Sequence, residues 1–486
     1  MPRGRVSASV ALCLGLASGL WLGCGDKPAP PPPPPPAVPD ARPADAGAAL
    51  TIDELPLGAA DLAAFGWRRR AGQRAFRQAR IAEGREDWAR VVTLCTQALA
   101  ADPGHLDAAW LIAIGFAELG QLDRVLAPLR QAAAGDFAKW GPASLEHPAL
   151  AAFLATPTGE AWRRRVELDR ARYAAALARA LIVTADGDLY GVEVDTGRWH
   201  RLTRTVGAVL GALEAPAARQ IAYVARVKRA GKRELGIGTI DLARGRGSRP
   251  VPVGSAGPIA VAYSAQPPIG FWVATGGPRA IAWRQFDDEY HFHALAKATP
   301  RPPGAWLEIT GKLSVRVHAL PSNVTADWDE QSLASAIRIG SSNRIVSVPS
   351  PGLIDGNTAA WSPDRVHLAF VAQLDDHCAA GAVNTAVFVA DAATGGAREL
   401  ERSASGIAVT WLAERRLAVA GDHGVTVRSL DDGVAPVAIA GATGLMSPRE
   451  RPRCAPVSAA DAPAADGEPA GDDGEPVDPT GAEPAH

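Results

Sequence analysis

The chain has 486 residues, 47% of them hydrophobic and 21% charged, and its 50 basic and 52 acidic residues give a net charge of −2. This balance excludes a dedicated nucleic-acid binder, which needs a strong basic field. Five cysteines in so long a chain exclude a disulfide scaffold, and a single apolar stretch near the start excludes a membrane protein with several spans. We therefore expect two to four domains.

The first residues have the pattern of a signal peptide. Arg3 and Arg5 precede an apolar run over 6–21, which is short for a bilayer span but right for the core of a signal peptide. The run ends at Gly23-Cys24, and small and polar residues follow. This ending resembles the lipobox of bacterial lipoproteins, in which the cysteine is acylated and becomes the first residue. We expect residues 1–23 to be removed and Cys24 to carry the lipid.

The resemblance implies a protein of the cell envelope of a Gram-negative bacterium, lipid-anchored to the outer membrane. Trp21 stands where that family has an aliphatic residue. An uncleaved anchor, or ordinary secretion with cleavage near Ala17-Ser18, is the alternative.

Residues 24–57 are predicted to be a disordered, proline-rich stalk. Seven consecutive prolines run from Pro30 to Pro36, and the residues around them offer few apolar side chains for a core. Such a segment favours an extended polyproline II conformation of ~3.1 Å per residue. A proline-rich ligand for a recognition domain is the competing interpretation.

Residues 58–178 are predicted to be helical and to contain two copies of a repeat. Units starting at Gly72 and Leu106 place small residues at their eighth and twenty-seventh positions, namely Ala79, Ala98, Ala113 and Ala132. This spacing resembles the tetratricopeptide repeat, where small residues let paired helices approach closely. Gln78 and Ala82 depart from the pattern, and no third copy follows. We expect a helix with Trp162, Val166, Leu168 and Tyr173 to cap the second unit, because two repeats bury too little alone.

Residues 179–446 change to short apolar runs separated by Gly, Pro and Asp, which predicts strands. Five runs look alike and recur at broadly regular spacing, with one double gap: Leu181–Val183, Ile221–Val224, Ile269–Val273, Leu368–Val371 and Leu417–Ala420. The double gap leaves room for a sixth copy at Leu313–Val317. Repeated units of 40 to 50 residues predict a β-propeller of about six blades. A pair of β-sandwiches is the alternative.

One tetrapeptide supports the propeller. Trp361-Ser362-Pro363-Asp364 resembles the W-S-P-D-G motif of TolB-type and WD-repeat-like propellers, with Arg365 in place of the glycine. The expected fold class is thus α+β multidomain: a tetratricopeptide-like helical module, then an all-β propeller.

We find no phosphate loop, nucleophile elbow or zinc motif, and we expect no catalytic residue and no cofactor. One polar cluster is a weak candidate for a metal site. If residues 287–293 form a strand, Glu289, His291 and His293 point to one face together with Asp287 and could hold a divalent cation. An exposed polar strand face explains the same residues.

Basic residues gather between positions 226 and 249. Such a patch could hold an anionic polymer or lipid headgroups, although hairpin loops of soluble propellers are often this charged. Its members are Arg226, Lys228, Arg229, Lys232, Arg233, Arg244, Arg246 and Arg249.

Residues 447–486 are predicted to be a disordered acidic tail. We expect Cys95, at an apolar position of the first repeat, to be a buried thiol. Cys378 and Cys454 lie on polar segments, and in an oxidising envelope we hypothesise a disulfide between them.

Helical repeats and propellers usually serve as binding surfaces, so by this analogy we expect a non-enzymatic scaffold or adaptor that binds an envelope protein or a peptide. The alternatives are an enzyme with its site in the propeller channel and a protein that binds an anionic glycan through the basic patch.

Overall fold

The structure, a computed structural model, describes residues 51–446 apart from internal gaps. The gaps are 67–70, 206–208, 216–217, 230, 244, 254–256, 278–282, 288–290, 296–298, 311–312, 318–319, 322, 330–333, 342–343, 350–351, 355–357, 375–384 and 405. The helices and sheets belong to one compact unit, which begins at Leu50.

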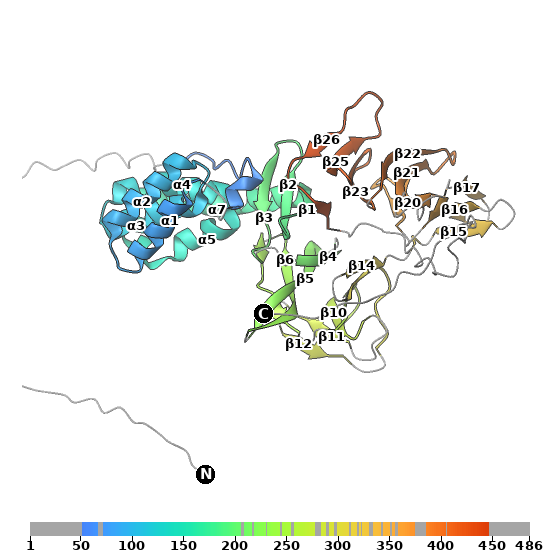
Figure 1. Ribbon diagram of the computed structural model, residues 1–486, viewed down its shortest axis with the longest axis horizontal. Coiled ribbons are helices and arrows are strands. Elements are labelled where there is room, and N and C mark those ends of the chain that lie inside the picture. Colours follow the sequence, from blue (N-terminus) through green and yellow to red (C-terminus); the bar gives the residue numbers. More distant parts are fainter. Residues whose placement is uncertain are drawn as a thin grey trace, which may run out of the picture. The chain divides into compact units, whose positions relative to one another are not determined.

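The described helices precede all of the strands and gather beside the first sheet (Figure 1). Helices α1 to α4 pack on one another in chain order. None of the described helices is both long and apolar enough to cross a bilayer. The α-helices are α1 (Gln73–Glu83), α2 (Trp88–Ala101), α3 (Leu106–Glu118), α4 (Leu126–Gly135), α5 (Phe137–Glu146), α6 (Ala151–Leu154) and α7 (Pro157–Arg179).

The small residues of the predicted repeat lie where the helices meet. Ala79, Ala98, Ala113 and Ala132 are all fully buried, and α3 begins at Leu106, where the second unit was predicted to start. A methyl side chain leaves room for the backbone of the neighbouring helix. Alanine at these four buried positions therefore lets the paired helices pack closely. Side-chain caps mark the helix starts, as at Asp87, whose carboxylate accepts from the Arg90 N–H at 3.2 Å.

Helix α7 closes the helical part, as predicted. The Trp162 side chain is fully buried, and its Nε1 donates to the Ser144 hydroxyl of α5 at 3.0 Å. Val166 and Tyr173 are also buried, but Leu168 is 62% exposed, so its predicted role in the cap is wrong. It lies on the outer face of the helix, away from the buried positions.

The folded part begins within the last residues of the predicted stalk. Leu55 and Leu57 are buried in the same core as the helices. The Leu55 N–H donates to the buried carboxylate of Asp169 at 3.4 Å, and Arg165 pairs with that carboxylate.

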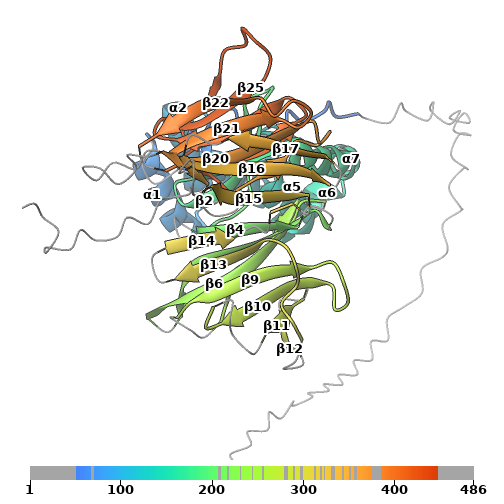
Figure 2. The ribbon, with the colours of Figure 1, turned by 90° about the vertical axis from the view of Figure 1, so that its right-hand side faces the viewer.

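Six antiparallel sheets follow among the described residues, each made largely of consecutive strands (Figures 1 and 2). The first holds β1 (Leu181–Ala185), β2 (Asp188–Glu193), β3 (Arg198–Arg201) and the last strand, β27 (Gly444–Leu445). The second holds β4 (Val209–Ala215), β5 (Gln220–Arg229), β6 (Lys232–Asp241), β7 (Arg246–Gly247) and β8 (Val251–Pro252). The third holds β9 (Ile259–Ser264), β10 (Gly270–Thr275), β11 (Arg284–Phe286), β12 (Phe292–Ala294), β13 (Trp306–Thr310) and β14 (Leu313–Val317).

The remaining three sheets complete the series. The fourth holds β15 (Val324–Asp329), β16 (Ala334–Ser341) and β17 (Arg344–Pro349). The fifth holds β18 (Gly352–Ile354), β19 (Ala360–Trp361), β20 (His367–Leu374), β21 (Thr385–Asp391) and β22 (Ala397–Ser403). The sixth holds β23 (Ala408–Ala413), β24 (Arg416–Gly421), β25 (Gly424–Ser429) and β26 (Val437–Ile439).

Apolar clusters join most of the neighbouring sheets, among them the first to the second, and the last sheet returns to the first. Separate clusters join the second sheet to the third, the fourth to the fifth and the fifth to the sixth. Another cluster joins the sixth to the first. Strand β27 pairs with β1 through Val183↔Leu445, so the last strand completes the sheet that the first strand begins. A ring of sheets closed in this way is a β-propeller.

The predicted apolar runs all lie on strands, in β1, β5, β10, β20 and β24. The sixth copy at Leu313–Val317 is wrong as a separate blade. It forms β14, which pairs with β13, and β13 pairs with β9 of the third sheet. The fourth sheet is built instead from strands β15 to β17. Their sequence mixes polar and apolar residues and does not repeat the pattern of the other blades.

The Trp361–Asp364 motif leads into β20 through a tight turn. The Ser362 hydroxyl accepts from the His367 N–H at 2.9 Å, and Arg365 adopts a positive φ of 60°. That is the conformation for which glycine is usual at this position.

Candidate functional site

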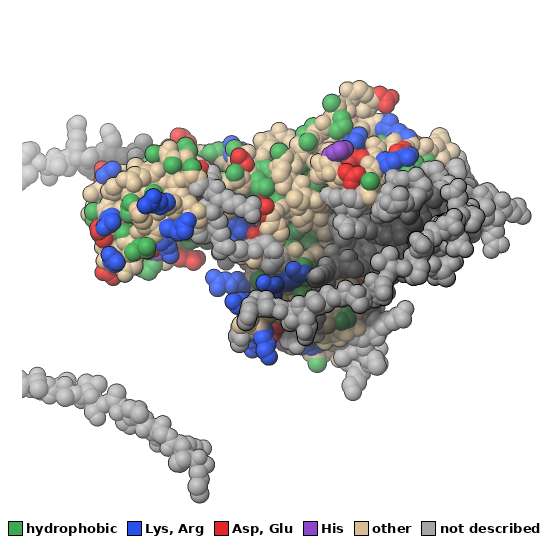
Figure 3. Space-filling view, in the orientation of Figure 1, with side chains coloured by type: hydrophobic (Ala, Val, Ile, Leu, Met, Phe, Trp, Pro, Cys, Tyr) green, Lys and Arg blue, Asp and Glu red, His purple; other side chains and the backbone are tan. Residues whose placement is uncertain are grey.

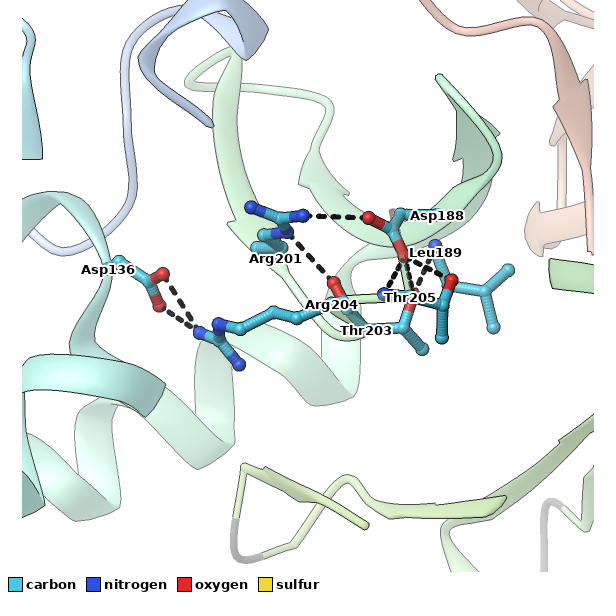
Figure 4. A network of polar contacts seen from close by, with 7 residues as sticks. All are labelled: Asp136, Asp188, Leu189, Arg201, Thr203, Arg204 and Thr205. Atoms are coloured by element: carbon cyan, nitrogen blue, oxygen red, sulfur yellow. Dashed lines mark hydrogen bonds and ion pairs between the residues drawn. The ribbon is translucent and has the colours of Figure 1, made fainter. Parts of the chain in front are cut away.

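A polar network joins the helices to the first sheet (Figure 4). Asp136, which caps α5, accepts from Nη2 of Arg204 through both carboxylate oxygens, at 2.6 and 2.8 Å. Arg204 follows β3, in the connection to the second sheet. The Asp136 side chain is only 6% exposed, so this ion pair lies largely out of water.

A second carboxylate holds the same connection in place. Asp188 accepts from Nη2 of Arg201 and from the hydroxyl of Thr203, each at 2.8 Å, and from the N–H of Thr205 at 2.8 Å. Donors from β3 and from the turn after it thus converge on one buried side chain, which fixes the turn that presents Arg204 to the helices (Figure 4).

Helix α7 and the first sheet also share aromatic contacts. The Tyr173 ring meets the His200 ring edge-on at 5.2 Å, and Nε2 of His200 lies 2.7 Å from Oε1 of Glu193. The hydrogen bond with His200 lowers the pKa of Glu193 from its ordinary value, and partial burial opposes that shift. Gly245, at φ +64°, leaves room for the Tyr173 ring, because a Cβ there would lie 2.3 Å from it. The helices and the first two sheets thus share one core and form a single body.

A cavity of about 610 Å³ lies between the second and third sheets. Its wall is aromatic and rich in proline, with one carboxylate and one guanidinium, and we call it the proline-walled cavity. The lining includes Tyr263, Trp272, Pro267, Pro300, Pro302, Pro303, Glu214 and Arg301. A cavity of a few hundred Å³ with an apolar wall and few charged groups is the usual form of a ligand site.

Two polar side chains of this cavity are hydrogen-bonded to backbone carbonyls, whereas Arg301 is in no ion pair with a described residue. The indole of Trp272 donates to the Pro268 carbonyl at 2.9 Å, and the Ser264 hydroxyl donates to the Gln266 carbonyl at 2.7 Å. The Arg301 guanidinium lies 4.9 Å from the centre of the Trp306 ring. Arg301 makes no ion pair with a described residue, so its donors remain available to an acceptor that enters the cavity.

A smaller cavity of about 230 Å³ lies among the innermost strands of three sheets. Glu214 of β4, Trp411 of β23 and Leu445 of β27 line it, as does Arg179 at the end of α7. It is therefore part of the propeller channel, at the side where α7 ends. Glu214 lines both cavities, and this shared residue places the proline-walled cavity beside the channel.

The residues of the predicted metal cluster do not lie on one strand. Strand β11 ends at Phe286, and β12, which begins at Phe292, pairs with it antiparallel. Asp287 accepts from the His291 N–H at 2.8 Å and contacts Nε2 of His293. Glu289 lies outside the described residues. Among those that are described, no group of three or more ligating side chains is placed to hold a metal ion.

Cys24, Cys378 and Cys454 also lie outside the described residues, and the lipid and the disulfide predicted for them stay predictions. Cys95 is a buried free thiol, as predicted.

Six of the eight predicted basic residues are exposed, and Arg244 and the side chain of Arg246 lie outside the described part of the chain. Five of the six lie at the end of the β5–β6 hairpin, beyond the last pairing of β4 with β5 at Val209↔Ala225. We call residues 226–234 the basic arm. Figure 3 shows Lys and Arg side chains gathered on this part of the surface.

The residues of the proline-walled cavity were not predicted as a site from the sequence. Tyr263 and Trp272 fit the pattern of ordinary strand residues, and the run Thr299–Pro303 contains no known motif. A proline-rich run beside aromatic strands was the available signal, because prolines in a loop between two strands can form a rigid apolar wall.

No protein-family model matches the chain, and a comparison with curated proteins finds no match. The solved structures that resemble this chain are β-propellers, and their similarity to it is low. A putative 6-phosphogluconolactonase from Bacteroides fragilis is 11% identical over 55% of this chain and 92% of its own, with a TM-score of 0.29. Hsv2 from Kluyveromyces lactis is 14% identical over 52% of this chain and 90% of its own, with a TM-score of 0.28. At such scores the propeller assignment rests on the sheets described above.

Proposed function

We propose that the protein is a non-enzymatic adaptor of the cell envelope, in which a tetratricopeptide-like helical module is fixed to a six-bladed propeller. The proline-walled cavity is the binding site for a peptide segment of a partner protein. The observation that carries this proposal is the lining of that cavity, which combines aromatic rings, several prolines and the Arg301 guanidinium.

The chemistry of the wall suits a short extended segment. Tyr263 and Trp272 offer flat apolar surfaces, on which proline or aliphatic side chains pack well. Arg301 offers a planar set of donors to a carboxylate. We therefore expect the partner segment to carry an apolar or proline residue next to an acidic side chain or a C-terminal carboxylate.

A display selection tests this function. A library of random peptides is panned against the purified chain from Cys24 to His486, and enriched peptides are measured against Tyr263→Ala and Arg301→Glu. Tyr263 is half-buried and Arg301 is exposed, so both variants should keep the fold. The control is Val434→Ala, on an exposed side chain of the sixth sheet.

Peptides that lose at least tenfold in affinity for both cavity variants, and none for the control, support the proposal. Enriched peptides that bind all three variants as well as the original chain, or a selection without enrichment, contradict it.

We further propose that acylated Cys24 anchors the protein to the outer membrane of a Gram-negative bacterium. Two or more acyl chains make membrane association stable, whereas one is marginal. Replacing Cys24 by Ser should release the chain into the soluble fraction of its host. A Cys24→Ser chain that is cleaved and still sediments with the membranes contradicts the anchor.

An enzyme acting in the channel is the second candidate, and Glu214 is the observation that favours it. The residue lines both cavities, and a glutamate beside a cavity is a residue type that can act as a general acid or base. Glu214→Gln keeps the shape of the side chain and removes its charge. If turnover of an identified substrate falls by a hundredfold in this variant while peptide affinity is unchanged, the enzyme is the better description.

A further inference from the structure

The basic arm is a two-stranded extension with no structural partner among the described residues. Strand β4 stops pairing with β5 at Ala225, and β8 pairs with β6 only at Gly236 and Ile237. Beyond these points β5 and β6 pair only with each other. A two-stranded hairpin is marginally stable alone, so this arm contributes little to the fold.

The charges on the arm oppose its own pairing. Lys228 lies directly across from Arg233, and Arg229 directly across from Lys232. Like charges in facing positions destabilise a hairpin. All four side chains are exposed, as is Arg226 at the base of the arm. An anion bound to the arm would offset this repulsion.

Several exposed arginines elsewhere in the fold are paired, unlike the cations of the arm. Arg80, Arg170, Arg402 and Arg415 each form an ion pair with a nearby carboxylate. The five cations of the arm form none with any described residue, and the Glu234 carboxylate, on the same hairpin, is not paired with them.

The sequence itself contains a matching anion. Residues 454–486 hold eight aspartate or glutamate residues and no lysine or arginine. Without that segment, 50 basic residues face 44 acidic ones. The near-neutral charge of the whole chain is therefore the sum of a basic body and an acidic end.

The acidic end can reach the arm. Met446, the last described residue, lines the channel cavity with Glu214, and Glu214 pairs with Ile221 of β5. Lys228 lies seven residues further along β5, roughly 24 Å at the rise of a strand. The acidic segment has 33 residues, and the end-to-end distance of a random coil of that length is about 30 Å.

We propose that the acidic segment 454–486 binds the basic arm of the same chain. Tethering raises the effective concentration of the segment to the millimolar range, so weak individual contacts between carboxylates and cations suffice. An external polyanion has to displace this segment before it can occupy the arm.

Carbodiimide cross-linking of the full chain tests the contact, because it joins only amines and carboxylates that touch. The chain has six lysines, of which two, Lys228 and Lys232, are on the arm. Trypsin releases 454–486 as one peptide, since no lysine or arginine follows Arg453. Lys139, 2.6 Å from Asp107, is the internal positive control for the reaction.

We expect the 454–486 peptide to be joined to Lys228 and Lys232 and not to Lys139, and we expect these links to be lost in 1 M NaCl, where the Debye length is about 3 Å. Mixing isotope-labelled and unlabelled chains should give links only within one chain. Links spread equally over all lysines, links between chains, or no links while Lys139–Asp107 forms, overturn the proposal.

Heparin chromatography tests whether the acidic segment of the same chain, and not an external polyanion, occupies the basic arm. A chain ending at Arg453 should elute at higher salt than the full chain. That difference should vanish when Lys228, Arg229, Lys232 and Arg233 are all changed to Glu. It should remain in a control with the same change of charge on the helices, namely Arg74→Glu, Arg77→Glu, Arg90→Glu and Arg163→Glu.

Melting curves establish that the variants are folded. If the full chain and the chain ending at Arg453 elute at the same salt concentration, the acidic segment does not occupy the arm, and the proposal is wrong.

Discussion

Arg204 and Asp136 lie far apart in sequence and form an ion pair that joins the helices to the propeller. Nη2 of Arg204 donates to both oxygens of a carboxylate that is 6% exposed. Since Asp136 also caps α5, one side chain fixes both the start of a helix and the position of the first sheet against it.

Replacing Arg204 by Ala should destabilise the whole unit. Removing one partner of a buried pair costs about 3–5 kcal/mol, and because the Arg204 side chain is 35% exposed we expect a loss of about 2–3 kcal/mol. Urea unfolding measures it. Arg170→Ala, which breaks an exposed pair with Glu167 on α7, is the control and should cost at most ~0.5 kcal/mol. Equal losses in the two variants would contradict the role of the junction.

The pair of Glu193 and His200 makes stability depend on pH. Because the pKa of Glu193 is lowered in the folded state, its contribution is present above the ordinary value of 4.5 and is lost as the pH falls through the folded value. The difference in unfolding free energy between the original chain and Glu193→Gln should therefore be larger at pH 7 than at pH 3. A Glu193→Gln difference that is constant over this range would count against the pair.

Cys95 should resist alkylation while the chain is folded. Burial raises the pKa of its thiol to about 12, the charge of Glu83 adds to this shift and that of Arg80 opposes it. At pH 8 the reactive thiolate is then roughly one part in ten thousand. Iodoacetamide followed by peptide mass spectrometry should find Cys95 unmodified in buffer and modified in urea. Rapid modification in buffer would show that the thiol is accessible.

Truncation should show how much the closing strand contributes. A chain that ends at Met446 keeps β27, and we expect its melting temperature to match that of the full chain. A chain that ends at Ala442 loses β27 and with it the buried side chains of Leu445 and Met446, which contribute about 1.5–3 kcal/mol each. We expect a fall of several degrees or loss of the cooperative transition. Identical melting curves would mean that the ring does not depend on β27.

The disulfide between Cys378 and Cys454 stays a hypothesis. The two residues are 76 apart in sequence, and closing such a loop stabilises a fold by roughly 4 kcal/mol before any strain is subtracted. Peptide mapping without reduction, on protein purified from the envelope, should find the two peptides linked. Two free thiols would show the hypothesis to be wrong.

The sequence predicted the fold best where local pattern and packing agree. Ala79 and Ala113 are small because a neighbouring helix lies against them, so the recurrence of small residues from one unit to the next reveals them directly. Leu313–Val317 also has the pattern of a strand, and it is one. Its assignment to a separate blade failed because the pairing partner of a strand depends on distant residues, here β13 and through it β9.

The candidate site was harder to predict for the same reason. Tyr263, Trp272 and Arg301 come from β9, β10 and the loop before β13, and the pairing of these strands within the third sheet brings them to one cavity. The His291 and His293 cluster was visible in the sequence because it is local. Its geometry was misjudged because Asp287 and His293 do not lie on one strand: β11 ends at Phe286, and His293 belongs to β12, which pairs with β11 antiparallel.

Because Val183 pairs with Leu445, the first sheet can be completed only late in the synthesis of the chain. The first sheet lacks its innermost strand until Leu445 has been made, so the ribosome releases almost the whole chain before the ring can close. Contacts this distant in sequence form slowly, because the entropy of closing the loop is lost before the contacts are gained. The nascent chain therefore has a long interval in which it is still open, and an export machinery or a chaperone that handles unfolded chains can engage it in that interval.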